Sequence, residues 1–161
     1  MKKLRLFLVL LFVALAWPVG AALADGPVLQ QDGGQVYFDE DVTLEPGEIH
    51  QGSLGLVNGD LTVPAGSIVR GDIFLTNGDA GIAGRVEGNV AVVRGDLALA
   101  PGSEVQGDVL GTGGSLDLAG TVRGDVSSMF GNLQVRSTAV LHGDLAVVSG
   151  TMTREAGAQV L

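Results

Sequence analysis

Residues 83–126 read AGRVEGNVAVVRGDLALAPGSEVQGDVLGTGGSLDLAGTVRGDV, and this stretch contains one short motif three times. The copies are RVEGNV at 85–90, EVQGDV at 104–109 and TVRGDV at 121–126, each with valines two residues before and after a glycine. The three glycines are separated by 19 and then 17 residues. A short unit that recurs at such a spacing is typical of solenoid proteins, in which each repeat packs on its neighbours.

Two series of glycines carry this repeat through most of the chain. The first is Gly52, Gly71, Gly88, Gly107, Gly124 and Gly143, and the second follows seven residues later at Gly59, Gly78, Gly95, Gly114, Gly131 and Gly150. Turns of 19 and 17 residues alternate, so the full repeat is a pair of turns of 36 residues. The longer turns have a wide corner such as Pro64-Ala65-Gly66, where the shorter ones have a lone Gly84 or Gly120. We interpret the glycines as corner residues with backbone angles that a Cβ would forbid.

Apolar residues alternate with other residues between the glycines, which predicts strands with one buried side. The inward positions form five columns, one of which is Val69, Val86, Val105, Val122, Leu141 and Val160. Of the 30 positions in these columns, 27 are apolar, and the exceptions are Gly111, Ser128 and Arg154. The sequence therefore predicts an all-β fold, a single-stranded parallel β-helix of six to seven turns over residues 33–161, with about three short strands in each turn.

Residues 1–24 are predicted to be a signal peptide. Lys2, Lys3 and Arg5 precede an apolar run at 6–17, and Ala22-Leu23-Ala24 places small residues at a cleavage site. We expect cleavage after Ala24 and export to the periplasm, the cell envelope or the extracellular space. The alternative is an uncleaved membrane anchor, although the run of twelve residues is shorter than the roughly 20 that a spanning helix needs. Residues 25–32 are predicted to be a flexible polar leader.

The charge of the chain excludes some partners. The 161 residues include 18 Asp and Glu against nine Lys and Arg, and the formal charge is −9. Removal of Lys2, Lys3 and Arg5 with the signal peptide leaves no Lys and a charge of −12. Such an acidic surface repels phosphate backbones and anionic lipid headgroups. We therefore expect no nucleic-acid partner, and contact with a membrane only through an uncleaved N-terminal segment.

The sequence predicts no catalytic, cofactor-binding or metal-binding residues. The only histidines, His50 and His142, are about five turns apart in the predicted coil, and there is no Cys. Turns of two alternating lengths do not follow the six-residue rule of left-handed β-helix enzymes. No turn has an insertion long enough to build a catalytic cleft. We therefore expect a protein that is not an enzyme and has no cofactor.

Two columns of acidic and polar residues have two possible roles. One is Asp72, Asn89, Asp108, Asp125 and Asp144, and the other is Asp60, Asp79, Asp96, Ser115, Asn132 and Thr151. Stacked carboxylates could bind calcium weakly. Asp, Asn, Ser and Thr also bond neighbouring backbone amides in turns, and their interchange within one column favours this second role.

The sequence also predicts two kinds of contact surface. Outward positions of the first strand of each turn form an apolar stripe, with Val57, Phe74, Val93, Leu110, Met129 and Val148 as candidates for a lateral interface. The partner would be another copy or another protein, although scattered exposed Val and Ala are also ordinary in strands. Candidates for end-to-end contacts are Tyr37 and Phe38 in the first turn and Val160 and Leu161 in the last.

The repeated motifs AGRVEGNV at 83–90 and AGTVRGDV at 119–126, with IVRGDI at 68–73, resemble the bactofilins, the polymer-forming cytoskeletal proteins of bacteria. The resemblance extends over about residues 40–161. It implies a right-handed β-helix of roughly triangular section that assembles end to end into non-polar filaments without nucleotide, often as a scaffold for cell-envelope enzymes. Typical members are cytosolic, whereas this chain begins with a predicted export signal.

We therefore predict a non-enzymatic structural protein whose main partner is itself, in a filament or scaffold of the cell envelope. Envelope proteins or cell-wall components are further candidate partners. The alternative is a monomeric surface adhesin or polysaccharide-binding β-solenoid. Carbohydrate binders usually present exposed aromatic residues, and only Tyr37, Phe38, Phe74 and Phe130 follow residue 24.

Overall fold

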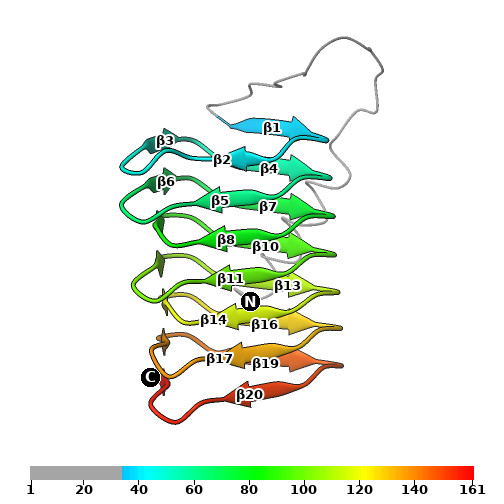
Figure 1. Cartoon of the computed structure of the whole chain (residues 1–161). Coiled ribbons are helices and arrows are strands. Elements are labelled where there is room, and N and C mark those ends of the chain that lie inside the picture. The colour runs from blue at the N-terminus through cyan, green and yellow to red at the C-terminus, as the bar shows by residue number, and fades with distance from the viewer. Residues whose placement is uncertain (1–33) are drawn as a thin grey trace, which may run out of the picture.

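The computed structural model describes residues 34–161, which form one β-solenoid with no helix (Figure 1). The predicted signal peptide and leader, residues 1–32, lie outside the described residues. Between residues 34 and 161 no helix is long and apolar enough to cross a membrane. The all-β prediction is confirmed, because strands of successive turns stack into three parallel sheets of seven strands each.

Each turn of the chain, or rung, contributes one strand to each sheet. The first sheet contains β1 (Gln35–Phe38), β4 (Leu54–Val57), β7 (Ile73–Thr76), β10 (Val90–Val93), β13 (Val109–Thr112), β16 (Val126–Met129) and β19 (Leu145–Val148). The second contains β2 (Val42–Thr43), β5 (Leu61–Val63), β8 (Ala80–Ile82), β11 (Leu97–Leu99), β14 (Leu116–Leu118), β17 (Leu133–Val135) and β20 (Met152–Arg154). The third contains β3 (Ile49–Gln51), β6 (Ile68–Arg70), β9 (Arg85–Val86), β12 (Glu104–Val105), β15 (Thr121–Val122), β18 (Val140–Leu141) and β21 (Gln159–Val160).

The strand register confirms the predicted stacking of like residues. Val105 of β12 pairs with Val86 of β9 on one side and with Val122 of β15 on the other. The alternation of longer and shorter turns holds in the middle of the rod. At the N-terminal end, however, two of the longer turns follow one another, from Gln35 to Leu54 and from Leu54 to Ile73.

The predicted inward columns form the core. In the second to sixth rungs the apolar members of all five columns are buried, and Ser128 is buried among them. The last rung differs, because no further rung covers it among the described residues. Met152 is 53% exposed, and Arg154 is also exposed, with its Nη2 donating a hydrogen bond to the Ala158 carbonyl (2.6 Å).

The interpretation of the two glycine series as residues with special backbone angles is wrong. Of these twelve glycines only Gly52 has a positive φ. The others lie where successive rungs touch: a Cβ at Gly78, for example, would overlap the backbone carbonyl of Gly59. The left-handed angle instead belongs to the residue before each glycine of the second series, as at Arg94 (φ 57°) and Phe130 (φ 56°). Apart from Gly52, glycine is needed in these two series because the stacked backbones leave no room for a side chain.

Candidate interaction surfaces

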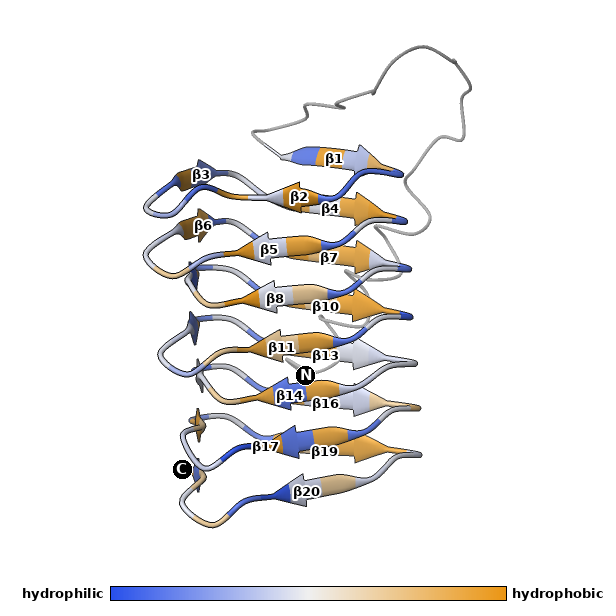
Figure 2. Cartoon of the chain, in the orientation of Figure 1, coloured by the Kyte–Doolittle hydropathy of each residue, from blue (hydrophilic) through white to orange (hydrophobic). Residues whose placement is uncertain are grey.

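The outward side of the first sheet has no charged residue on its seven described strands, and we call it the uncharged face. Alternate residues of these strands point outward in two rows. The first row is Val36, Gly55, Phe74, Ala91, Leu110, Ser127 and Ala146, and the second is Phe38, Val57, Thr76, Val93, Thr112, Met129 and Val148. Figure 2 shows apolar residues along β4, β7, β10 and β19, and hydrophilic residues in the turns that follow β4, β7 and β10.

All six candidates for a lateral interface lie on the uncharged face. Phe74 and Leu110 belong to the first row, and the other four belong to the second. The apolar stripe is not continuous, since Thr76 stands between Val57 and Val93 in the second row. Most of these side chains are half-buried by their neighbours in the row, while Val148 at the end of the rod is exposed.

The third sheet has a charged outer side. Glu104 lies between arginines of the two neighbouring rungs, at 3.6 Å from Nη1 of Arg85 and 2.5 Å from Nε of Arg123. Arg70 approaches Glu87 at 3.9 Å on the same side of the rod. These arginines are therefore already paired with carboxylates on their own face.

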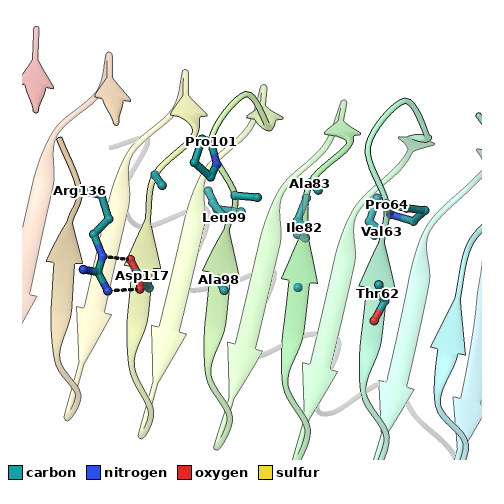
Figure 3. A pocket seen from close by; sticks show the side chains of 13 residues that line it. Thr62, Val63, Pro64, Ile82, Ala83, Ala98, Leu99, Pro101, Asp117 and Arg136 are labelled. Carbon is teal, nitrogen blue, oxygen red and sulfur yellow. Dashed lines mark hydrogen bonds and ion pairs between the residues drawn. The ribbon is translucent and has the colours of Figure 1, made fainter. Parts of the chain in front are cut away.

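The second sheet borders a shallow apolar groove with a volume of about 420 Å³ (Figure 3). Wide corners at Pro64 and Pro101 flank the short corner at Ala83, so the alternation of long and short turns produces the hollow. Ala98 and Gly81 in its floor are too small to fill it. The residues that line the groove include no arrangement of nucleophile, acid and base.

An arginine clasp that the sequence analysis missed closes one end of the groove. The Arg136 guanidinium donates two hydrogen bonds to Asp117, from Nε (2.7 Å) and Nη2 (2.6 Å), and a third from Nη1 to Glu155 (3.1 Å). Hydrogen bonding from Arg136 lowers the pKa of Asp117. The pKa of Glu155 is lowered first by the backbone N–H of Ser137 and then by Arg136. The signal in the sequence was that each carboxylate lies 19 residues from Arg136 along the chain.

Both acidic columns form hydrogen-bond ladders with the backbone. In one, Asp60 Oδ1 accepts the N–H of Asp79, and Asp79 Oδ1 accepts the N–H of Asp96, both at 2.8 Å. In the other, Asn89 Oδ1 accepts the N–H of Asp108, and Asp108 Oδ1 accepts the N–H of Asp125, also at 2.8 Å. The role in turns that the sequence favoured is confirmed. No group of three or more His, Cys, Asp or Glu in residues 34–161 is placed to hold a metal ion.

The four candidates for end-to-end contacts lie at opposite ends of the rod. Tyr37 points inward, and its hydroxyl donates to Gln35 Oε1 (2.5 Å), while burial raises the pKa of the phenol. Phe38 instead belongs to the uncharged face. Val160 ends an inward column and Leu161 is 69% exposed. Met152, which the sequence analysis did not propose, adds an exposed apolar side chain at this end.

The two histidines are far apart, as the repeat predicts. His50 is buried in β3, and its Nε2 has no hydrogen-bond partner. His142 is exposed beyond β18, and four strands of the third sheet separate β18 from β3. The two imidazoles do not belong to one site.

The family of the chain follows from a comparison with family models. The model described as Bactofilin, polymer-forming cytoskeletal, matches residues 61–160. The chain belongs to the bactofilin family. The match begins at the first residue of β5 and ends at the last residue of β21, so it contains most of the stacked rungs of this bactofilin. No curated protein and no solved structure matches the chain.

The ladders of this bactofilin give a first prediction. Asp79→Ala removes the acceptor for the Asp96 N–H, and we expect a loss of about 1 kcal/mol in the free energy of unfolding. Asp79→Asn keeps an oxygen acceptor and should lose less than half as much. Chemical denaturation of both variants measures the difference. A calcium site would give a different result. Asp79→Asn and Asp79→Ala would then lose similar amounts of stability, and millimolar calcium would raise the Tm of the wild type but not of either variant.

Proposed function

We propose that this bactofilin is exported and assembles end to end into a non-enzymatic scaffold of the cell envelope. The observation that carries the proposal is the family match on a rod of stacked parallel rungs. At each end of the described rod, all three sheets have an edge strand with one unpaired side: β1, β2 and β3, and β19, β20 and β21. Unpaired strand edges are templates for pairing with another chain.

Assembly in this form needs no catalytic group or nucleotide. The stacking that holds one rung on the next, with buried apolar columns and backbone ladders, would continue across the junction between two molecules. Partly exposed inward residues at the last rung, Val160 and Met152, would be buried there. The free energy of assembly would therefore come mainly from apolar burial and strand pairing.

Electron microscopy of the purified protein tests the assembly. We expect filaments of wild-type protein and of Gln159→Asp, whose side chain points outward in β21. Val160→Asp places a carboxylate in the inward column next to Leu141, and we expect it to prevent filaments while circular dichroism still reports a folded rod. A wild-type protein that stays monodisperse and monomeric at high concentration would contradict the proposal and favour an autonomous binding module.

The export part of the proposal rests on residues 1–24. Intact mass spectrometry of the protein recovered from its producing bacterium, after cell fractionation, should give a chain that begins at Asp25. A protein in the cytosolic fraction that still begins at Met1 would contradict export. A full-length protein in the membrane fraction would indicate the uncleaved anchor.

A further inference from the structure

The distribution of charge around the rod is uneven. The uncharged face has two outward positions on each of its seven strands and no ionisable side chain at any of them. The third sheet has paired arginines and glutamates, and the second has the Arg136 clasp. In a chain with a formal charge of −9, one face without charge is an exception. Thr76, Thr112 and Ser127 interrupt the apolar rows of this face, but none of them is charged, and a largely apolar surface with a polar rim is typical of a protein contact.

Acidic residues border part of each edge of the uncharged face. The first edge is acidic from β7 to β19 except at Asn89, and the second edge is acidic only from β1 to β10, because residues 113–115, 130–132 and 149–151 contain no charge. Along the edge where its strands begin stand Asp72, Asp108, Asp125 and Asp144. The turns that follow its strands contain Asp39, Glu40, Asp41, Asp60, Asp79 and Asp96. Arg94 is the one basic residue in these turns within residues 34–161. Arg70 and Arg123 stand two residues before the first edge, but they face Glu87 and Glu104 on the third sheet.

These borders determine which partner suits the face. A second copy packed sheet to sheet, about 10 Å away, would bring acidic borders of the same sign together within a Debye length. Anionic lipid headgroups would meet the same repulsion. A partner with an apolar centre and basic flanks would complement both the rows and the borders.

We propose that the uncharged face is a docking strip for an amphipathic helix of a partner protein, with Leu- or Ala-type residues against the two rows and Lys or Arg against the acidic borders. The proposal extends the scaffold role by naming the chemistry of what the scaffold holds. The strip lies on the side of the rod, so end-to-end assembly leaves it accessible along the whole filament.

The dimensions of the strip fit such a helix. Four-residue strands at about 3.3 Å per residue give a width of about 13 Å, and an α-helix with side chains is about 10–12 Å across. Six steps between rungs at about 4.8 Å give a length of about 29 Å, which matches a helix of about 20 residues. Phe74 and Leu110, two rungs apart in the same row, are the largest side chains near the middle of the strip.

The test uses a synthetic peptide of about 20 residues, long enough to span the strip as a helix, with Leu and Ala on one helical face and Lys on both flanks. Fluorescence anisotropy measures its binding to the purified protein. A second peptide has Glu at every Lys position. Leu110→Asp changes the centre of the strip, and Thr62→Asp, outward on β5 in the second sheet, is the matched control. Because each variant adds one negative charge, simple charge attraction would strengthen binding of the Lys peptide to both.

We expect the Lys peptide to bind wild type and Thr62→Asp alike, and to bind Leu110→Asp at least tenfold more weakly. The double variant Asp79→Asn and Asp96→Asn, which keeps oxygen acceptors in the ladder, should also weaken binding and reduce its salt dependence. The Glu peptide and vesicles with anionic lipid should not bind.

Several results would overturn the docking strip. They are equal binding of the Lys peptide to wild type and Leu110→Asp, equal binding of the two peptides, and vesicle binding that Leu110→Asp abolishes. A lateral dimer of wild type that Leu110→Asp dissociates would identify a second copy as the occupant instead. Electron microscopy of Leu110→Asp distinguishes a failure of docking from a failure of assembly. If this variant still forms filaments but no longer binds the Lys peptide, the substitution has affected only the docking strip. If the wild type binds the Lys peptide but forms no filaments, the proposed scaffold is contradicted and the docking strip is not.

Discussion

Leu75→Asp is expected to abolish the folded rod. Leu75 is 0% exposed in β7 of the first sheet and pairs with Leu56 and Val92 in one inward column. Loss of a buried leucine side chain alone costs about 2–5 kcal/mol. A carboxylate without a partner in an apolar core adds several kcal/mol of desolvation. The sum is comparable with the whole stability of an ordinary domain, about 5–15 kcal/mol.

Circular dichroism would then give no β-sheet signal and no cooperative thermal transition for Leu75→Asp. The matched control is the preceding residue, Phe74→Asp, because its side chain lies on the uncharged face. We expect Phe74→Asp to lose no more than about 1 kcal/mol of stability. If the two substitutions have the same effect on folding, the assignment of inward and outward positions is wrong.

The sequence was sufficient to predict the inward columns, because alternate side chains of a strand point to opposite sides of the sheet and only one of the two sets is apolar. A slip of one residue would move every apolar side chain to the outside. The recurrence of Val86, Val105 and Val122 at the spacing of one turn therefore determined both the strand and its buried side. The pairing of Val105 with the other two confirms this reasoning.

The physical cause of the glycine lattice could not be predicted in the same way. A repeated glycine indicates that a side chain is excluded, but not whether backbone angle or a neighbouring rung excludes it. Residues such as Arg94 and Phe130 gave no sign of their left-handed angles, since that region usually favours Gly, Asn or Asp. The Arg136 clasp was also missed, because outward charges carry no periodic constraint.

The candidate surfaces were predicted in part. The six lateral candidates were found because alternation places them opposite the buried columns. Their two-row arrangement depends on cross-strand register, which places Thr76 beside Val57 and Thr112 beside Met129. The acidic borders were visible as columns, but their position along the edges of the uncharged face required the sheet boundaries. Only the positions of the strands show that the acidic residues and the apolar rows lie next to each other on the same face.

Gly78→Ala is expected to be the second most damaging substitution, with a loss of about 3 kcal/mol in the free energy of unfolding. The added methyl group would overlap the carbonyl of Gly59 in the preceding rung. The two rungs would have to separate where Asp79 holds them together: its N–H donates to Asp60 Oδ1 (2.8 Å), and its carbonyl accepts the N–H of Leu61 (2.9 Å). One methyl group therefore disturbs several hydrogen bonds.

Two other glycines separate the effect of contact from that of backbone angle. Gly81 is exposed in β8, and a Cβ there would meet nothing within 4 Å, so Gly81→Ala should stabilise the rod by about 0.5 kcal/mol. Gly102 also has open space but a φ of +86°, so Gly102→Ala should cost about 1 kcal/mol. Denaturation curves of the three variants should thus rank Gly78 as most sensitive and Gly81 as least. If Gly102→Ala costs more than Gly78→Ala, backbone angle matters more than the contact between rungs. In that case close stacking would not be the reason for the glycine lattice.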